Sequence, residues 1–296
     1  MMSGSNEALS MYEQYYGLTE KPFNLTPDTD FYYQSLTHRD ALNVLLLAIE
    51  SGDGFIKLTG EVGTGKTLLC RKLLDLLDEQ RYQTVYIPNP YMSCGELLRA
   101  VVEEMGIESQ VCDGNYLSCI NHHLIANARQ QRQTVILLDE AQSLPVESLE
   151  AIRLLSNLET QKHKLVQIVL FGQPELDVRL SDDSIRQLKQ RIVHACSLQQ
   201  LDAGNVAQYV QHRLAAAGYC GSALFSDKAC RRLYRLTRGV PRLINLLANK
   251  ALLLAYASGE FHVSQRIVEQ AARDSLHNLK LSGAAIAGQR RAAVTA

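Results

Sequence analysis

The sequence lacks any apolar run long enough to cross a lipid bilayer. The longest such stretch, residues 41–49, is interrupted by Asn43 and falls well short of the roughly 20 residues that a transmembrane helix needs. The N-terminus also lacks a basic segment followed by an apolar core, which excludes a typical secretory signal peptide. Together these two absences predict a cytoplasmic protein.

Net charge is nearly absent as well. The 30 basic and 31 acidic residues leave a formal charge of −1 at pH 7. A chain with this balance has no global electrostatic signature for nucleic acid. The balance therefore argues against a nucleic-acid partner, although a local basic patch remains compatible with it.

The seven cysteines form no Cys-x-x-Cys pair and no Cys/His spacing typical of a metal site. We expect them to be free and mostly buried thiols, as in a reducing compartment. Cys112 and Cys119 fall in a predicted loop-to-helix region, so they are expected to be more exposed than the others.

What the sequence does contain is a strong phosphate-binding motif. Residues 55–67, FIKLTGEVGTGKT, place an apolar strand before the pattern G-x-x-x-x-G-K-[ST], the Walker A loop. Its glycines let the backbone curl so that successive N–H groups point at one centre, and the next helix adds its unpaired N–H groups and positive dipole end. We expect Lys66 to reach the β- and γ-phosphates of ATP and the Thr67 hydroxyl to bind Mg²⁺. The predicted nucleotide-binding residues of this stretch are Gly60, Glu61, Val62, Gly63, Thr64, Gly65, Lys66, Thr67 and Leu68.

A second motif predicts hydrolysis. The apolar run TVILL, residues 134–138, ends in Asp139 and Glu140. In an open α/β sheet ligands bind at the carboxyl ends of the strands. We expect Asp139 to hold the Mg²⁺ hydration shell and Glu140 to polarise the attacking water. An acidic pair that only caps the following turn is the alternative, and the upstream Walker loop weighs against it.

Strand-like and helical segments alternate over the first two thirds of the chain. The strands are expected at residues 55–58, 84–87, 134–138, 165–171 and 192–196. An apolar run without alternation, such as 134–138, suits a central parallel strand that is covered on both faces. Alternating strands and helices predict an open parallel α/β sheet.

Beyond residue 200 the pattern changes. Residues 203–280 contain no strand-like run and predict helices near 204–217, 227–237, 241–258 and 264–278, with Ser226 and Ser264 as plausible caps. We therefore expect four parts: a flexible leader at 1–11, a nucleotide-binding α/β domain at 12–200, an α-helical lid domain at 201–280 and a disordered tail at 281–296.

The segment that precedes the Walker strand is rich in aromatic residues, including Tyr15, Tyr16, Phe23 and Phe31. Such a segment can fold over the adenine ring, or it can pack against the sheet as ordinary core. Aromatic anchors suit both tasks equally, so the sequence leaves both open.

Three further polar residues occupy positions that suit phosphate chemistry. Gln173 follows the fourth strand and could hold the attacking water, or it is a turn residue before Pro174. Arg191 precedes the fifth strand and could reach a neighbouring subunit's γ-phosphate, and Arg186 is the other candidate for this role. Either residue could instead be an ordinary surface arginine. Arg242 follows Gly-Val-Pro at the start of a lid helix, a position that would aim it back at the nucleotide.

The motifs GEVGTGKT, VILLDEAQ, LFGQPEL, LKQRI and GVPR, in this order, resemble those of AAA+ ATPases. More narrowly, the opening YYGLTEKPFNLTPDTDFYY is similar to that of the ExeA/general secretion pathway protein A family, and the resemblance covers roughly residues 11–280. It implies an α/β P-loop NTPase fold: a three-layer sandwich with a five-stranded parallel sheet of order 5-1-4-3-2, and a small all-α lid.

The same resemblance implies an ATPase that acts as a homo-oligomer, either a ring or an ATP-dependent dimer or hexamer, and turns over slowly without partners. It casts Gln173 as sensor 1, Arg191 as the arginine finger and Arg242 as sensor 2, beside Lys66 and Glu140. The implied function is to drive or regulate assembly of an MSHA-like type IV pilus or a related secretion machine, with inner-membrane assembly proteins as partners.

Secretion-type members of this family carry a transmembrane helix and a peptidoglycan-binding domain, and the printed sequence shows neither. We expect any role at the membrane or wall to need a partner, with peripheral contact at the cytoplasmic face of the inner membrane.

A DNA-binding AAA+ regulator of the transposition type is the alternative function. Its best support is the run RRLYRLTR at residues 231–238, basic with an aromatic in between. The same run could meet anionic lipid headgroups, or it could be an ordinary solvated helix face.

Overall fold

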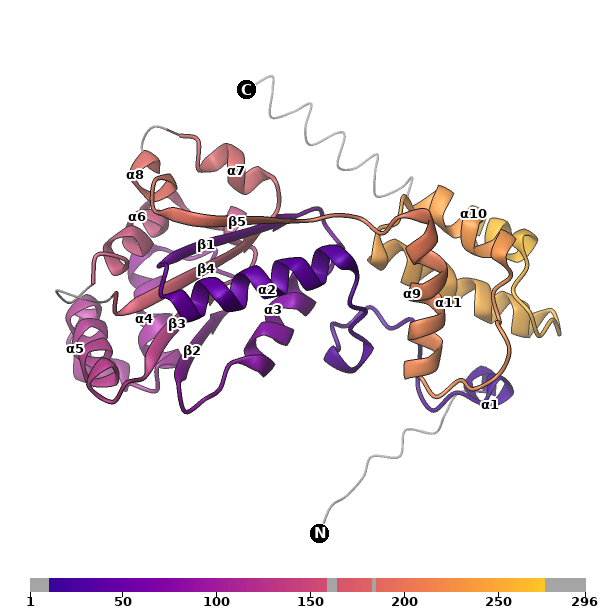
Figure 1. The fold of residues 1–296 in the computed structure, drawn as a ribbon, viewed down its shortest axis with the longest axis horizontal. Helices are drawn as coiled ribbons and strands as arrows, with labels where there is room; N and C mark the ends of the chain where they lie inside the picture. Colours follow the sequence, from indigo (N-terminus) through magenta and orange to yellow (C-terminus); the bar gives the residue numbers. More distant parts are fainter. Residues whose placement is uncertain (1–10, 159–163, 183–184, 275–296) are drawn as a thin grey trace, which may run out of the picture. The chain divides into compact units, whose positions relative to one another are not determined.

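The computed structural model describes residues 11–158, 164–182 and 185–274. They form two compact units (Figure 1), one spanning residues 34–199 and the other joining the residues up to 33 with those from 200 onward. The predicted leader at 1–11, apart from Met11, and the predicted tail at 281–296 lie outside the described residues.

The first unit is built on a five-stranded sheet, ordered β2-β3-β4-β1-β5. All the neighbouring strands pair in parallel, so the predicted parallel sheet of order 5-1-4-3-2 is confirmed. The strands are β1 (Phe55–Gly60), β2 (Tyr82–Ile87), β3 (Gln133–Leu138), β4 (Val166–Gly172) and β5 (Ile192–Leu198).

Burial along the strands follows their position in the sheet. Central β3 and β4 are buried at nearly every residue, as their unbroken apolar runs predict. The edge strand β5 instead alternates between partly buried and exposed residues. Phosphate-loop strand β1 lies between β4 and β5, so its carboxyl end is flanked by structure on both sides.

Helices pack on the sheet in two groups. The first group is α2 (Leu36–Ser51) and α3 (Lys66–Leu76), which contact each other and β1. The second is α4 (Cys94–Glu104), α5 (Tyr116–Arg129) and α6 (Val146–Leu155), among which α4 contacts α5, α6 and β2. Short helices complete the unit: η2 (Ser109–Cys112), η3 (Ala141–Ser143), α7 (Glu175–Arg179) and α8 (Arg186–Lys189). Ser93 caps α4 through a capping box with Glu96, which confirms the predicted cap.

The second unit is helical as predicted. It contains α1 (Met11–Tyr16), η1 (Thr29–Phe31), α9 (Ala203–Ala216), α10 (Asp227–Thr237), α11 (Pro241–Ala257) and a helix that occupies residues 265–274 of the described chain. The side chain of Ser226 caps α10, and that of Ser264 accepts a hydrogen bond from the Ile267 amide. Both predicted caps are therefore present.

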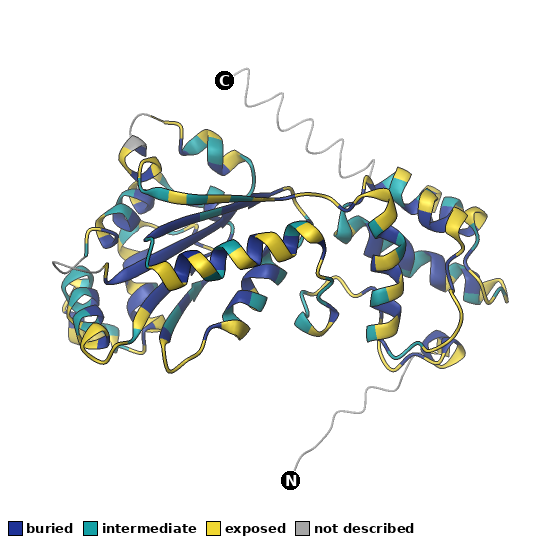
Figure 2. Cartoon of the chain, in the orientation of Figure 1, coloured by how far each residue is buried: buried dark blue, intermediate teal, exposed yellow. Residues whose placement is uncertain are grey.

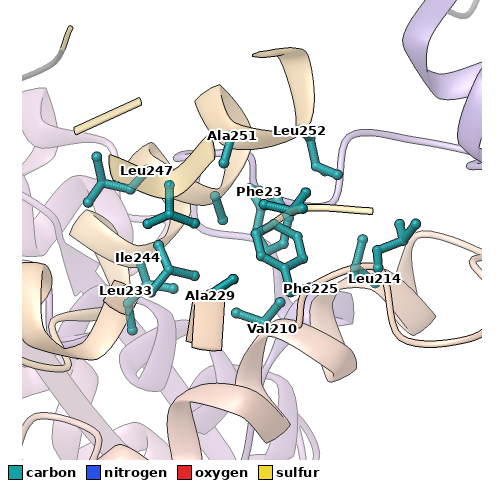
Figure 3. Packing of buried hydrophobic residues seen from close by; sticks show 14 of the residues in the cluster. Phe23, Val210, Leu214, Phe225, Ala229, Leu233, Ile244, Leu247, Ala251 and Leu252 are labelled. Atoms are coloured by element: carbon teal, nitrogen blue, oxygen red, sulfur yellow. The ribbon is translucent and has the colours of Figure 1, made fainter. Parts of the chain in front are cut away.

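The placement of residues 12–33 corrects the sequence-based boundary. They were expected within the α/β domain, but they belong to the helical unit. Phe23 packs among Val210, Phe225 and Leu252 (Figure 3). Apolar anchors fill any core of suitable shape, so the sequence pattern alone does not reveal which core takes them.

A buried arginine fastens this segment to the helices. The Arg213 guanidinium on α9 donates to the carbonyls of Pro22 at 2.6 Å and Asn24 at 3.2 Å, and it lies 4.3 Å from the centre of the Phe31 ring. Burial lowers the pKa of Arg213, and its charge is compensated by these carbonyl and aromatic contacts.

The expectation of seven free thiols is wrong in one respect. A disulfide joins Cys112 to Cys119, whose Cα atoms lie 5.8 Å apart. Between them Asp113 and Gly114 both have positive φ, and this turn brings the start of α5 back toward η2. The cysteines at positions 70, 94, 196, 220 and 230 are free.

None of the helices within the described ranges is both long and apolar enough to cross a membrane.

Candidate nucleotide-binding site

The phosphate loop joins the carboxyl end of β1 to the first turn of α3 (Figure 1). Gly63 and Gly65 have φ of 80° and 101°, a region that residues with a Cβ rarely adopt. A Cβ at Gly60 would lie 2.8 Å from Thr64 Oγ1, so only glycine leaves room for the curled loop. Glu61 and Val62 are exposed at the tip of the loop. Leu68 lies in the first turn of α3 and is partly buried.

Lys66 is buried inside this loop. Its Nζ donates to the carbonyls of Gly60 at 2.8 Å and Glu61 at 3.1 Å. Burial lowers the pKa of Lys66, and the nearby carboxylates of Glu140 and Asp139 act in the opposite direction. A cation is thus held within a turn whose backbone N–H groups favour anions.

Thr67 and Asp139 meet at the same edge of the sheet. The Thr67 hydroxyl donates to Asp139 Oδ2 at 2.7 Å, although 72 positions separate the two residues in the chain. The Glu140 amide donates to the other oxygen of Asp139 at 2.9 Å. Asp139 is almost fully buried, and burial raises its pKa, whereas these two hydrogen bonds act to lower it.

Glu140 sits in a strained position. Its φ of 51° and ψ of 36° are left-handed, which is uncommon for a residue with a side chain and occurs often at functional sites. Its Oε2 accepts hydrogen bonds from two side-chain amides, one from Gln173 at 3.0 Å and one from Gln142. The structure therefore brings Gln173 to Glu140, and both to the edge where Lys66 lies.

Gln142 is a site residue that the sequence reasoning missed. Its amide oxygen accepts from the backbone N–H of Gln173 at 3.0 Å while its amide nitrogen donates to Glu140. Arg179 on α7 donates to the Gln142 carbonyl. Gln142 thus connects the turn after β3 with the end of β4, and its place two residues beyond Glu140 in DEAQ was the available signal.

His38 is the second missed residue. This buried side chain on α2 bridges Ser35 Oγ at 2.7 Å and the carbonyl oxygen of Thr64 in the phosphate loop at 3.0 Å. Since a carbonyl can only accept, Nε2 carries the proton toward Thr64 and the Ser35 hydroxyl donates to Nδ1. Burial lowers the pKa of His38, which favours this neutral form. A Cβ at Gly65 would lie 3.0 Å from the ring, so the contact is close.

Arg191 lies at the opposite end of the sheet. Ile192, the next residue, pairs with Phe55 at the start of β1, whereas the phosphate loop follows the end of β1. Six strand residues separate these ends by about 20 Å. Arg191 donates from Nη1 to Ser156 Oγ at 3.2 Å and does not reach the phosphate loop of its own chain.

The two remaining candidate arginines, Arg186 and Arg242, lie in different units. Arg186 is the first residue of α8. Arg242 is exposed in the first turn of α11, in the helical unit. The turn before it is fixed, because Gly239 has φ of 78° and a Cβ there would lie 1.8 Å from the Leu201 carbonyl oxygen. The Leu201 amide donates to the Gly239 carbonyl at 2.9 Å.

Comparison with known proteins agrees with this geometry. A family model described as an AAA domain matches residues 49–180. Over 255 residues the chain is 42% identical to "General secretion pathway protein A" of Aeromonas hydrophila. The chain is a homologue of general secretion pathway protein A, and it contains a segment that matches an AAA domain. The match covers 86% of this chain and 46% of that protein, so the chain spans about half the length of its relative.

Solved structures show the same fold at low sequence identity. Cdc6p from Pyrobaculum aerophilum superposes with a TM-score of 0.63 and 17% identity, over 84% of this chain and 71% of that one. The ORC2 protein of Aeropyrum pernix, solved as ADPNP–ADP complexes, gives 0.60 and 16%, over 83% and 71%. The RuvB Holliday junction branch migration motor of Thermotoga maritima gives 0.54 and 13%, over 85% and 72%. These likenesses establish the P-loop AAA+ fold.

Proposed function

We propose that the chain binds ATP with Mg²⁺ at the phosphate loop and hydrolyses it. One observation carries this proposal: Lys66, Thr67, Asp139 and Glu140, two pairs far apart in the sequence, share one edge of a parallel sheet. The homology to an AAA+ secretion protein supports the same conclusion.

The residues fit a magnesium–triphosphate group. Thr67 and Asp139 offer oxygen ligands 2.7 Å apart, the donor type that Mg²⁺ prefers. Lys66 now contacts two backbone carbonyls of its own loop, and phosphate oxygens would replace them as acceptors. Two glycines with positive φ leave the loop amides free to converge on an anion. When bound, the metal would supply charge neutralisation for the transferred phosphoryl group.

The protein's own groups then have distinct tasks. Lys66 neutralises negative charge that develops on the phosphate oxygens. Glu140 takes a proton from the attacking water, and Gln173 positions that water through its amide. We assign Gln142 the role of a positioning residue, because it connects Glu140 to the backbone of Gln173.

The test of hydrolysis uses Glu140→Gln. It should keep ATP affinity within a few-fold of the parent while phosphate release falls by about 10²–10⁴, since only the base is lost. Binding is measured with a fluorescent ATP analogue and turnover with a phosphate-release assay. Turnover at the parent's rate would remove Glu140 from the mechanism.

We further propose that the active form is an oligomer in which Arg191 serves the neighbouring subunit's nucleotide. Support comes from its distance from its own loop, about one strand length. Mixing Arg191→Ala with Lys66→Ala subunits tests this: each variant is inactive alone, and activity should return in the mixture because one subunit supplies the loop and the other the arginine. No recovery at any ratio would contradict action between subunits.

For the cellular role we propose assembly or regulation of a secretion or type IV pilus machine at the cytoplasmic face of the inner membrane. The supporting observation is the 42% identity to general secretion pathway protein A. A narrower relation to the MSHA pilus protein MshM stays a prediction. Affinity purification with the Glu140→Gln variant in ATP should capture the assembly partners. Capture that is identical with and without nucleotide would contradict an ATP-gated role.

The alternative function, a DNA-binding regulator, is supported by the exposed basic residues of α10. Arg242 as sensor 2 also stays a prediction, and Arg242→Ala should lower turnover at saturating ATP if it holds.

A further inference from the structure

Helix α10 has two sharply different faces. Its buried residues Ala229, Cys230, Leu233 and Thr237 pack into the core of the helical unit. Four basic residues, Lys228, Arg231, Arg235 and Arg238, follow one another at steps of three or four positions and are exposed. This spacing places Lys228, Arg231 and Arg235 along one side of the helix, opposite the buried residues, and Arg238 follows as the C-cap just beyond the last helical residue. The exposed outer side of α10 is visible in Figure 2.

These four residues, which we call the basic face, form no ion pair among the described residues, although the exposed Asp227 lies on the same helix one turn before Arg231. Several other arginines do form one: Arg99 pairs with Glu103, Arg153 with Glu150 and Arg266 with Glu260. Even on α10 itself, Arg232 pairs with Glu269 at 3.1 Å. In a chain with net charge −1, four neighbouring cations beside a single carboxylate, Asp227, are a local excess of positive charge.

The basic face is displayed on a rigid support. Ser226 caps the start of α10, and Arg238 ends it in a left-handed conformation. The next residue, Gly239, is locked against the Leu201 backbone. From Lys228 to Arg235 the helix rises about 10 Å, so these three charges form a straight row of fixed length, and Arg238 follows at its C-terminal end.

We propose that the basic face of α10 binds the phosphate backbone of nucleic acid. A group of four exposed cations that form no ion pair among the described residues is complementary to a polyanion whose duplex carries one charge per about 1.7 Å of axis. A membrane-binding helix would also need apolar side chains to insert, but the apolar residues of α10 are buried in the unit's own core. Its large side chain nearest the basic face, Tyr234, packs against that core as well.

Helix α10 has no fully exposed aromatic ring, and this determines the mode of binding that we expect. Base stacking needs an exposed ring, and base reading needs side chains that enter a groove. The basic face offers charges alone. Binding should therefore be independent of sequence, and it should weaken steeply as salt rises.

The experiment measures the affinity of the whole chain for a fluorescent 20-base-pair duplex of arbitrary sequence, by anisotropy, at several KCl concentrations. If all four cations contact phosphates, log K should fall with log[KCl] at a slope of about −3 to −4. Replacing Arg231 and Arg235 by Gln should reduce this slope by about 2 and weaken binding at least tenfold at low salt. The double charge reversal, Arg231→Glu with Arg235→Glu, should weaken it further.

The matched control is Lys21→Glu with Arg129→Glu, which changes net charge by the same amount at two exposed positions outside α10. It should bind DNA like the parent within a few-fold. If both double charge reversals weakened DNA binding equally, the effect would come from net charge alone, and the proposal would be overturned. Parent binding with a flat salt dependence would overturn it as well.

Two further measurements keep the outcome decisive. Anionic phosphatidylserine vesicles serve as a second probe: binding to vesicles through Arg231 and Arg235, with no duplex binding, would assign the face to membranes instead. ATP hydrolysis without DNA reports on the proposed function independently, because Arg231 and Arg235 are outside the nucleotide site. The Gln variants keep helix propensity, and their thermal unfolding confirms that any loss is not loss of fold.

Discussion

The two units of this chain handle charge in opposite ways. In the α/β unit the charged groups around the phosphate loop are buried and hydrogen-bonded: Lys66 donates to two carbonyls, and Asp139 accepts from Thr67 and an amide. In the helical unit the four cations of the basic face are exposed and form no ion pair within the described residues. Buried charges need partners already in place, whereas solvent stabilises exposed ones until a polyanion arrives. The first arrangement suits a small site of defined geometry, and the second suits a large and regular surface.

Replacing Lys66 by Met should give the largest effect on ligand binding. We expect ATP affinity to fall by more than about a hundredfold, because the only buried cation of the loop is lost. The thermal stability of the nucleotide-free protein should not fall, since burial of the ammonium is itself a cost to folding. Calorimetric titration and a melting curve check both parts. A large drop in Tm would show that Lys66 holds the loop together rather than preparing it for phosphate.

Phe23→Ala addresses the helical unit. Emptying this buried position should cost about 3–5 kcal/mol of that unit's stability. Chemical denaturation followed by tyrosine fluorescence, with Phe31→Leu as a conservative control, measures the change. A cost below about 1 kcal/mol would mean that residues 12–33 contribute little to the core.

Gln142→Leu removes one of the two side-chain amides that donate to Glu140. Loss of one amide should lower kcat by about tenfold, an amount typical of one positioning hydrogen bond, and leave KM for ATP nearly unchanged. Gln142→Asn, which is shorter by one methylene, should not restore the rate. An unchanged kcat, or a rise in KM alone, would contradict the positioning role.

His38→Gln tests the support behind the phosphate loop through pH. Burial places the folded-state pKa of His38 below its ordinary 6.5, so acid protonates the unfolded chain more readily than the folded one. The stability that neutral His38 contributes is present above pH 6.5 and is lost as the pH falls from there through the folded-state pKa. The parent should therefore lose more Tm than His38→Gln between pH 7.5 and 5.5. Equal losses would exclude His38 as a contributor.

The smallest effect is expected on α10. Arg231→Gln should change the free energy of unfolding by less than about 0.5 kcal/mol, because an exposed and unpaired side chain contributes little to folding. A destabilisation above 1 kcal/mol would mean that the basic face contributes to folding stability, and it would contradict the proposed difference between the two units.

How much the sequence predicts depends on how local the determining interactions are. The phosphate loop is one continuous motif, so Lys66 and Thr67 are recognisable in a single window. The sheet and its order follow from alternating segments and a family resemblance, and both are confirmed.

Residues whose partners lie far away in the chain escape such reasoning. His38 contacts a carbonyl 26 positions later, and Gln142 one amide 31 positions later. The disulfide between Cys112 and Cys119 depends on a turn that no spacing rule identifies. The net charge is uninformative for a related reason: the sum of −1 over the whole chain does not reveal the local group of cations on α10.

The division of the helical core between the two ends of the chain has a consequence for biosynthesis. Tyr12, Tyr16 and Phe23 emerge first from the ribosome, but the helices that enclose them begin only after residue 200. The α/β unit lies between these two parts of the sequence, so its chain is fully synthesised before the helical unit can fold. Nascent chains therefore carry exposed aromatic residues for most of translation, roughly ten seconds or more at bacterial elongation rates. Any fragment that starts at residue 34 would leave the later helices without the side chains that fill their centre.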